Sequence, residues 1–242
     1  MVNAIILSAG QGKRLLPLTE ACPKCMLHVA GKSILEWQVQ ALLAAQIDKL
    51  YIITGFNSDL VEEHIQDRFG AEQDRINIVY NPFYSISDNL ASCWMARHAM
   101  EEDFILLNGD TLFEPALLDT VLRSTPAPVT LTIDYKDSYD NDDMRVELQD
   151  SMVQAVGKTL PDEHTMAESI GLLYFRGEGP ALFRTQLDRQ MKQGDGLRLW
   201  FLSVVDTLAK QSQVQACSIN GHRWCEIDFK RDLDNAEKIM LQ

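Results

Sequence analysis

The chain has 242 residues, of which 46% are hydrophobic, and a formal net charge of −13. Its length allows one substantial domain with a real core. The acidic balance argues against nucleic acid or an anionic membrane as a partner, because either would repel the chain. The apolar run 2–9 lacks a basic flank and cannot span a bilayer, so it predicts a buried strand and a cytoplasmic protein.

Strands alternate with helices through the first half of the chain. The first helix is expected from Ser33, which forms an S-x-x-E capping box with Glu36. Alternation of this kind predicts a Rossmann-like, doubly wound α/β sheet. The expected strands are 4–7, 50–53, 76–79 and 104–107, and the later helices lie near 59–68 and 89–100.

The second half of the chain changes to shorter strands, which we interpret as a small acceptor-binding β extension of a mixed sheet. No linker or repeat is visible, so we predict a single domain. Within it, residues 1–125 would bind a nucleoside triphosphate (NTP), residues 126–225 an acceptor, and residues 226–242 would close the site. The expected strands are 129–134, 144–148, 153–156, 170–175 and 214–219, with helices at 115–122, 179–192, 197–210 and 231–241.

A glycine pair follows the first strand directly. Gly10 and Gly12 let backbone N–H groups approach a phosphate, and Lys13 and Arg14 add charged donors. The loop is neither G-x-G-x-x-G, because Leu15 follows Arg14, nor a P-loop. On its own, the pair is equally compatible with a plain tight turn.

The residues after the glycines make the pattern specific. The segment is Leu7-Ser8-Ala9-Gly10-x-Gly12-x-Arg14-Leu15-x-Pro17-Leu18-Thr19, and Pro23-Lys24-x-Met26 follows. This pattern resembles the signature of the nucleotidyltransferase family that makes nucleotide sugars and CDP-alcohols. The resemblance implies the fold of that family and a catalytic role for three cations, Lys13, Arg14 and Lys24. It also implies nucleotide binding by the loop residues Leu7, Ser8, Ala9, Gly10 and Gly12.

Carboxylates near both ends of the chain are candidates for a metal site. Asp110 follows an apolar strand, where an open α/β sheet places its ligands, although a turn cap is the simpler interpretation. Glu226 and Asp228 alternate as in a strand and would share a face. The resemblance assigns Mg²⁺ to Asp110 and Asp228, with Asp110 also at the nucleotide. Glu226 could support the metal, contact the acceptor, or lie at the surface.

The cysteines offer a weaker alternative site. Cys22 and Cys25 form a C-x-x-C, but Cys217 and Cys225 are poorly spaced as a second zinc pair. Five cysteines without an export signal fit reduced thiols. We therefore expect no metal or redox role for them.

The nucleotide is suggested by the segment Asn81-Pro82-Phe83-Tyr84, with Asp88-Asn89 and Ser92 behind it. This spacing resembles the phosphocholine cytidylyltransferases and related CTP enzymes, which have Asn-Asn where this chain has Asp88-Asn89. CTP is therefore the expected nucleotide. Asn81, Asn89 and Ser92 could hydrogen-bond the pyrimidine or ribose, although Asn89 and Ser92 could instead cap a helix.

The acceptor is expected to be a small phosphorylated or phosphonate compound. Lys158 follows a glycine and resembles the family's lysine for the acceptor phosphate. An acidic run that includes Asp142 and Asp143 could meet a cationic head group, with Trp200 or Trp224 as a cation–π face, or could be a solvated loop. Phosphocholine, phosphoethanolamine and 2-aminoethylphosphonate would fit, and a sugar 1-phosphate or inositol phosphate stays open.

The implied chemistry is in-line attack of the acceptor oxygen on the α-phosphorus, with pyrophosphate leaving. An anionic acceptor needs no general base, so catalysis would rest on alignment and charge neutralisation. A non-catalytic nucleotide-binding subunit of the same fold is the alternative from a different class. Damage to the loop or the aspartates would mark such a subunit, and all of these residues are present.

Overall fold

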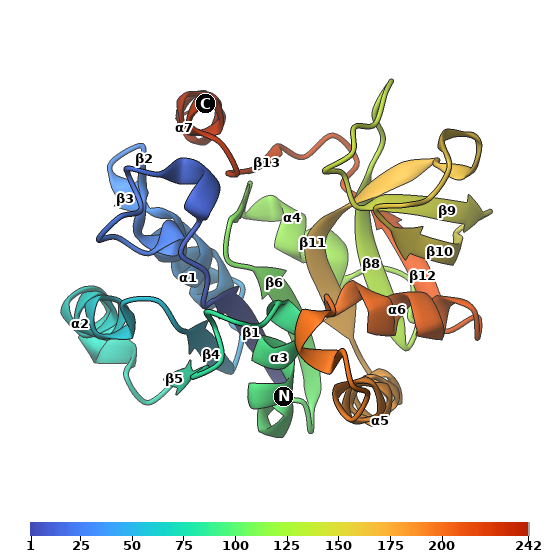
Figure 1. Ribbon diagram of the computed structural model, residues 1–242, viewed down its shortest axis with the longest axis horizontal. Coiled ribbons are helices and arrows are strands. Elements are labelled where there is room, and N and C mark those ends of the chain that lie inside the picture. The colour runs from blue at the N-terminus through green and yellow to red at the C-terminus, as the bar shows by residue number, and fades with distance from the viewer. Residues whose placement is uncertain (242) are drawn as a thin grey trace.

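A nine-stranded mixed sheet forms the centre of the molecule, and the computed structural model describes residues 1–241 of the chain. Its strand order is β5-β4-β1-β6-β11-β8-β12-β10-β9 (Figure 1). The first four strands in this order are parallel and β11 is antiparallel to β6. Their bounds are β5 Ile76–Tyr80, β4 Lys49–Thr54, β1 Val2–Ser8, β6 Asp103–Asn108 and β11 Ala167–Phe175.

Helices cover both faces of the sheet, because alternate side chains of each buried strand are apolar on either face. On one face, α1 (Ile34–Ala44), α2 (Ser58–Phe69) and α4 (Ala116–Leu122) pack on the same core as Ile6 and Leu107. On the other, α3, α5 and α6 pack with Ile5 and Leu106 (Figure 1). These helices span α3 Asn89–Met95, α5 Gly179–Met191 and α6 Leu202–Ala209. The doubly wound mixed sheet is confirmed.

The strands of the second half join the same sheet. Strand β11 lies between β6 and β8, so it connects the nucleotide-side strands to the rest. The β extension expected from the sequence therefore begins at the middle of the sheet and continues to its edge. The remaining strands are β8 Val129–Asp134, β9 Arg145–Gln149, β10 Met152–Gly157 and β12 Val214–Ser218.

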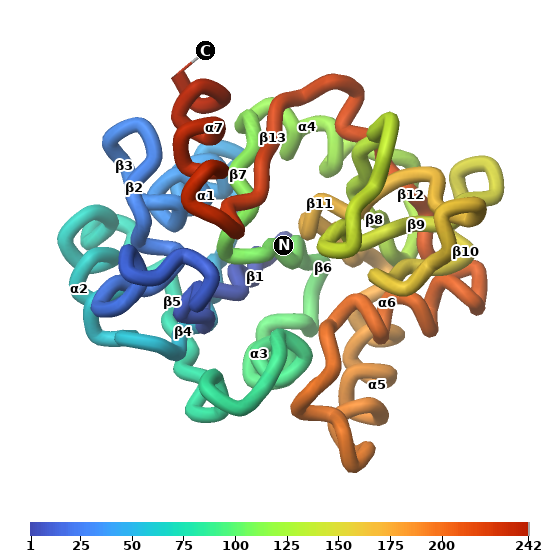
Figure 2. Tube along the Cα trace, turned by 45° about the horizontal axis from the view of Figure 1, so that its top comes forward, coloured from blue at the N-terminus to red at the C-terminus, as the bar shows by residue number. Residues whose placement is uncertain are grey.

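A third, smaller core lies above the carboxyl ends of the parallel strands. It packs Leu15 from the glycine loop against Ile227 and against Ala236 of α7 (Lys230–Met240). Figure 2 shows the C-terminal helix beside the N-terminal segment that contains β2 and β3. The short strands near this core are β2 His28–Val29, β3 Lys32–Ser33, β7 Thr111–Phe113 and β13 Trp224–Glu226. Residues from both ends of the sequence thus share one apolar cluster.

The capping box predicted at the start of α1 forms only in part. The Ser33 hydroxyl accepts the backbone N–H of Glu36, as expected. The Glu36 carboxylate does not return to the cap, because it pairs with Arg68 of α2 at 2.7 Å. This buried carboxylate therefore joins two helices instead of closing the box.

Three predicted elements are shorter than expected. The helix expected over 89–100 ends at Met95, and the one expected from 197 begins at Leu202. Strand β13 ends at Glu226, before Asp228.

Single 3-10 turns occupy Lys13–Leu15, Lys24–Met26, Gly70–Glu72, Arg97–Ala99, Asp162–His164 and Gly196–Arg198. Within residues 1–241, no helix is long and apolar enough to cross a membrane.

Candidate active site

A cavity of about 740 Å³ opens where the parallel strands end. Leu7 of β1 is in register with Asn108 of β6, so the glycine loop and Asp110 leave the sheet side by side. The cavity is lined by the loop from Ala9 to Arg14, by Asp110, and by residues of the second half such as Lys158. This is the crevice at the carboxyl ends of the strands, where open α/β sheets bind ligands.

The glycine loop is fixed by its packing and its hydrogen bonds. The Thr19 hydroxyl donates to the Gly12 carbonyl at 2.8 Å, and Leu15 is buried in the third core. Gly12 has φ of 76°, and a Cβ there would lie 2.9 Å from the Lys24 Cβ, so this position requires glycine. A Cβ on Gly10 would meet no atom within 4 Å, so the protein's own packing does not require that glycine.

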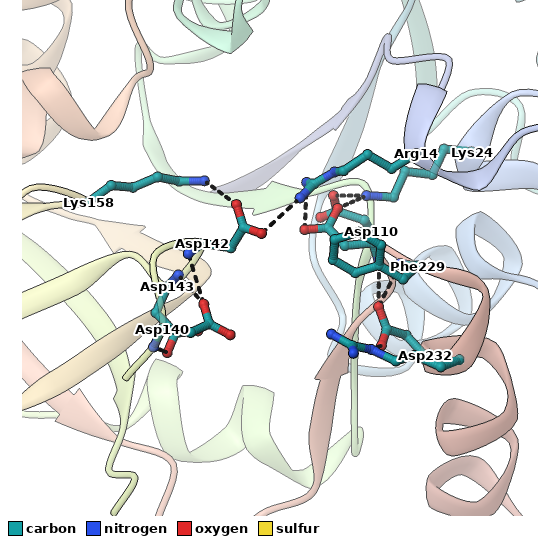
Figure 3. A network of polar contacts seen from close by, with 11 residues as sticks. Arg14, Lys24, Asp110, Asp140, Asp142, Asp143, Lys158, Phe229 and Asp232 are labelled. Carbon is teal, nitrogen blue, oxygen red and sulfur yellow. Dashed lines mark hydrogen bonds and ion pairs between the residues drawn. The ribbon is translucent and has the colours of Figure 1, made fainter. Parts of the chain in front are cut away.

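Lys24 connects the two aspartates. Its ammonium donates to Asp110 at 2.6 Å and to Asp228 at 2.8 Å (Figure 3). Arg14 pairs with the other oxygen of Asp228 at 2.7 Å. Burial disfavours the Lys24 charge, but the two carboxylates outweigh it and raise the pKa of Lys24 above its ordinary value. Residues from three distant parts of the sequence therefore form one charge cluster.

A third carboxylate completes this cluster. Oxygens of Asp110, Glu226 and Asp228 all lie within 4.8 Å of one another. The Asp110 Oδ1 is buried and has no hydrogen-bond partner. Glu226 lines the cavity. Desolvation by the surrounding atoms, together with the negative charges of the two aspartates, raises the pKa of its carboxyl group. The three side chains offer hard oxygen ligands around one point, and carboxylate oxygens of this kind can hold a divalent cation such as Mg²⁺.

The cavity is also lined by Asn81, Asn89 and Ser92, and some of their donors and acceptors already form hydrogen bonds within the protein. The Asn81 amide donates to the Ser92 hydroxyl at 3.1 Å, and its oxygen accepts the Phe83 N–H. The Asn89 oxygen accepts the Phe201 N–H at 2.9 Å. Neither Asn89 nor Ser92 caps α3, so the capping interpretation is wrong. The Ser92 hydroxyl hydrogen, the Asn89 amide nitrogen and the second N–H of the Asn81 amide are donors that remain.

Two cations, one from the glycine loop and one that follows β10, face one carboxylate. Arg14 lies 3.3 Å from Asp142, and Lys158 lies 3.7 Å from the other Asp142 oxygen (Figure 3). Trp200 lines the same part of the cavity, and the Lys158 ammonium lies 4.9 Å from the centre of its indole ring. The Asp142 carboxylate therefore sits between two positive groups at the mouth of the cavity.

Glu168, at the start of β11, is a cavity residue that the sequence patterns missed. Its Oε2 accepts from Lys136 at 2.6 Å, and the same ammonium donates to Asp143 at 3.0 Å. The side chain is 4% exposed and lines the cavity. The sequence did contain one signal. Glu168 is the only charged residue of the segment Ala167–Phe175, which forms a strand of nine buried residues.

Some predicted residues lie elsewhere. Ser8 does not line the cavity, because its side chain is buried on the opposite side of β1, beside Gly109. Trp224 is also outside the cavity and donates to Asp134 at 2.7 Å, so the prediction of a cation–π face there is wrong. Among the described residues, the only cluster of possible metal ligands excludes the cysteines, and Cys22 and Cys25 are free thiols.

Three named proteins are similar to this chain in sequence. Choline-phosphate cytidylyltransferase of Streptococcus pneumoniae is 23% identical over 99% of this chain and 98% of its own length. CTP:phosphoglutamine cytidylyltransferase of Campylobacter jejuni is 26% identical over 96% of this chain and 98% of its own. CMP-5'-(3-aminopropyl)phosphonate synthase of Streptomyces rubellomurinus is 32% identical over 52% of this chain and 20% of its own.

Solved structures share the fold across the whole chain. The inositol-1-phosphate CTP transferase from T. maritima superposes with a TM-score of 0.82 at 18% identity, covering 99% of this chain and 94% of its own. The CTP:phosphocholine cytidylyltransferase from Streptococcus pneumoniae gives 0.81 at 22% identity, covering 99% of both chains. The family model described as nucleotidyl transferase matches residues 3–143, which is more than half of the chain. This chain therefore belongs to the nucleotidyl transferase family.

Proposed function

We propose that this chain transfers CMP from CTP to a small phosphorylated or phosphonate acceptor and releases pyrophosphate. The observation that carries the proposal is the position of Lys24, held between Asp110 and Asp228 beside the glycine loop. This arrangement gathers a cation and three carboxylates at one point of the large cavity. Such a site is suited to neutralising phosphate charge during transfer.

Magnesium fits the carboxylate cluster. The unpartnered Asp110 Oδ1 needs a positive partner, and Glu226 and Asp228 supply further oxygens within 4.8 Å. When bound, Mg²⁺ would neutralise and orient the phosphate oxygens of the nucleotide. Lys24 and Arg14 already contact Asp228, so these cations are placed to meet phosphate oxygens at the same point. We therefore propose Asp110 and Asp228 as metal ligands, with Glu226 beside them.

The nucleotide would lie along the glycine loop. Gly10 leaves open space on its cavity side, where backbone N–H groups and Lys13 can approach the phosphates. Ser92 and Asn89 keep donors that suit the acceptor atoms of a pyrimidine edge or of the ribose. The names of the three relatives described above all refer to cytidine nucleotides, which favours CTP.

The acceptor's anionic group would replace the Asp142 carboxylate. Arg14 and Lys158 approach Asp142 from two sides, as they would approach two oxygens of a phosphate. A phosphate or phosphonate bound there would lie next to the Lys24 cluster, because Arg14 contacts both. The acceptor oxygen is already an anion, so the attack requires alignment and no general base.

A pyrophosphate-release assay tests the function. CTP, UTP, ATP and GTP would each be combined with phosphoethanolamine, phosphocholine, 2-aminoethylphosphonate, glucose 1-phosphate and inositol 1-phosphate. We expect release with CTP and an amine-bearing acceptor, and release that is slower by roughly two to three orders of magnitude from the Asp228→Asn variant. Release only with a sugar or inositol phosphate would establish the alternative acceptor class. Nucleotide binding without release from any pair would instead identify a non-catalytic binding subunit.

A further inference from the structure

Glu168 has a buried oxygen without a partner beside the acceptor part of the cavity. One oxygen accepts from Lys136 at 2.6 Å, whereas Oε1 makes no hydrogen bond in the structure. The residue is 3% exposed and lines the cavity. A buried carboxylate oxygen that lacks a donor is costly, and native structures rarely keep one without a ligand or water.

The charges around Glu168 leave a negative excess. Lys136 is shared between Glu168 and Asp143, so one ammonium faces two carboxylates. Burial raises the pKa of Glu168 to about 7, although Lys136 acts against this shift and Asp143 adds to it. The pair of carboxylates therefore lacks one positive charge, which a proton or a cationic ligand would supply.

The cations Arg14 and Lys158 line the same cavity as this charge deficit. Arg14 and Lys158 both face Asp142, and Asp143 is the following residue. Asp142, Asp143 and Glu168 line the same cavity. A zwitterionic acceptor would therefore place its anionic group between Arg14 and Lys158 and its ammonium group beside Glu168.

We propose that Glu168, with Asp143, selects acceptors that carry a primary ammonium group on a short spacer, and that Glu168 Oε1 accepts a hydrogen bond from that ammonium. This inference rests on the proposed function and specifies the acceptor for the same site. Glu168 acts as a specificity-determining residue at the end of the acceptor away from the reacting phosphate.

The surroundings distinguish a primary ammonium from a trimethylammonium group. A quaternary cation has no N–H to donate, and proteins usually hold it among several aromatic faces. Four aromatic side chains line this cavity, counted over residues 1–241. Phe56 and Tyr84 belong to the nucleotide side, Phe201 is fully buried, and Lys158 already lies over the Trp200 ring. An open carboxylate oxygen suits an N–H donor instead.

Three matched acceptors test the proposal: phosphoethanolamine, phosphocholine, and 2-hydroxyethyl phosphate, which has a hydroxyl in place of the ammonium of the first. With wild-type protein and CTP, kcat/KM should be at least roughly tenfold higher for phosphoethanolamine than for phosphocholine. Glu168→Gln should lower kcat/KM for phosphoethanolamine roughly 10- to 100-fold, the usual effect of losing a charge-assisted hydrogen bond. It should leave 2-hydroxyethyl phosphate and the KM for CTP unchanged.

Controls separate selectivity from folding. Glu163 lies in an exposed turn outside the cavity, so Glu163→Gln removes the same charge and should change none of these values. An equal loss for all three acceptors in Glu168→Gln would assign Glu168 a structural role and overturn the proposal. A wild-type protein that uses phosphocholine as well as phosphoethanolamine would overturn it too, without any variant.

Calorimetric titration of phosphoethanolamine and phosphocholine into wild-type protein with Mg²⁺ and CMP keeps the two claims apart. Tighter binding of phosphoethanolamine without pyrophosphate release would contradict the proposed function and leave the amine site intact. Turnover with equal binding of the two compounds would support the function and contradict the amine site.

Discussion

The two halves of the sheet present ligand-binding groups in different ways. On the nucleotide side, the backbone at Gly10 and Gly12 forms the surface, and parallel strands fix its position. On the acceptor side, the site is made of paired charges such as Lys158 with Asp142 and Lys136 with Glu168. If the first half binds the triphosphate as proposed, its backbone surface suits a constant ligand, whereas exchange of a few side chains in the second half would change the acceptor.

The largest effect should come from the aspartates that both halves share. Asp110→Asn or Asp228→Asn should lower turnover by roughly two to three orders of magnitude, because a positioned charge at the phosphates is lost. Pyrophosphate release measures this loss, and circular dichroism should show an unchanged fold. Asp119→Asn on the exposed face of α4 is the matched control. Near-normal turnover in either cluster variant would remove the metal assignment.

Lys158→Met tests the acceptor half alone. The methionine keeps much of the side-chain volume and removes the charge that faces Asp142 and Trp200. We expect kcat/KM for the acceptor to fall roughly 10- to 100-fold, while the KM for CTP stays constant. Lys210→Met, which removes an exposed charge paired with Asp206, should leave both unchanged. A change confined to the CTP kinetics would show that Lys158 contacts the nucleotide and not the acceptor.

Gly10→Ala tests the nucleotide half. A methyl group fits the protein there without a clash, so the melting temperature should stay unchanged. It would, however, stand between the backbone and a phosphate, and CTP binding should weaken roughly tenfold through a lost hydrogen bond. Isothermal titration with CTP measures this effect. Gly194→Ala, which also meets no atom within 4 Å, is the control, and equal behaviour of the two variants would contradict the loop's role.

A further effect, on stability and not on turnover, is a pH dependence that comes from Glu168. Burial raises the pKa of Glu168 from 4.5 to about 7, so the folded protein holds this proton more tightly than the unfolded chain. Stability should therefore fall as pH rises from about 4.5 to about 7, relative to Glu168→Gln, and the difference should then level off. Urea unfolding across this range measures it. A difference that is constant with pH would show that Glu168 has an ordinary pKa.

The sequence predicted the fold of the first half well because its signals are local. The motif from Leu7 to Lys24 is nearly contiguous, and alternating apolar strands revealed the sheet. Asp110 was recognisable because it follows a buried strand directly. Ser8 was misplaced because the motif names consecutive residues, whereas side chains of a strand alternate between its faces.

The acceptor half was less predictable because its contacts depend on strand pairing. Glu168 meets Lys136 and Asp143 from a different segment, and their proximity follows from the register of β11 with β8 and β9. Trp200 and Trp224 were indistinguishable as candidates, since both are tryptophans near the end of the chain. Only the fold shows that Trp200 lines the cavity and that Trp224 binds Asp134.

The third core has a consequence for how the protein matures on the ribosome. Leu15 from the glycine loop is buried against Ile227 and Ala236, so this loop is supported by residues that are synthesised long after it. Domains fold as units when their partners are available. The nascent chain therefore cannot complete its catalytic cavity until residues near 236 have left the exit tunnel, and a truncated translation product that lacks them would lack a supported loop.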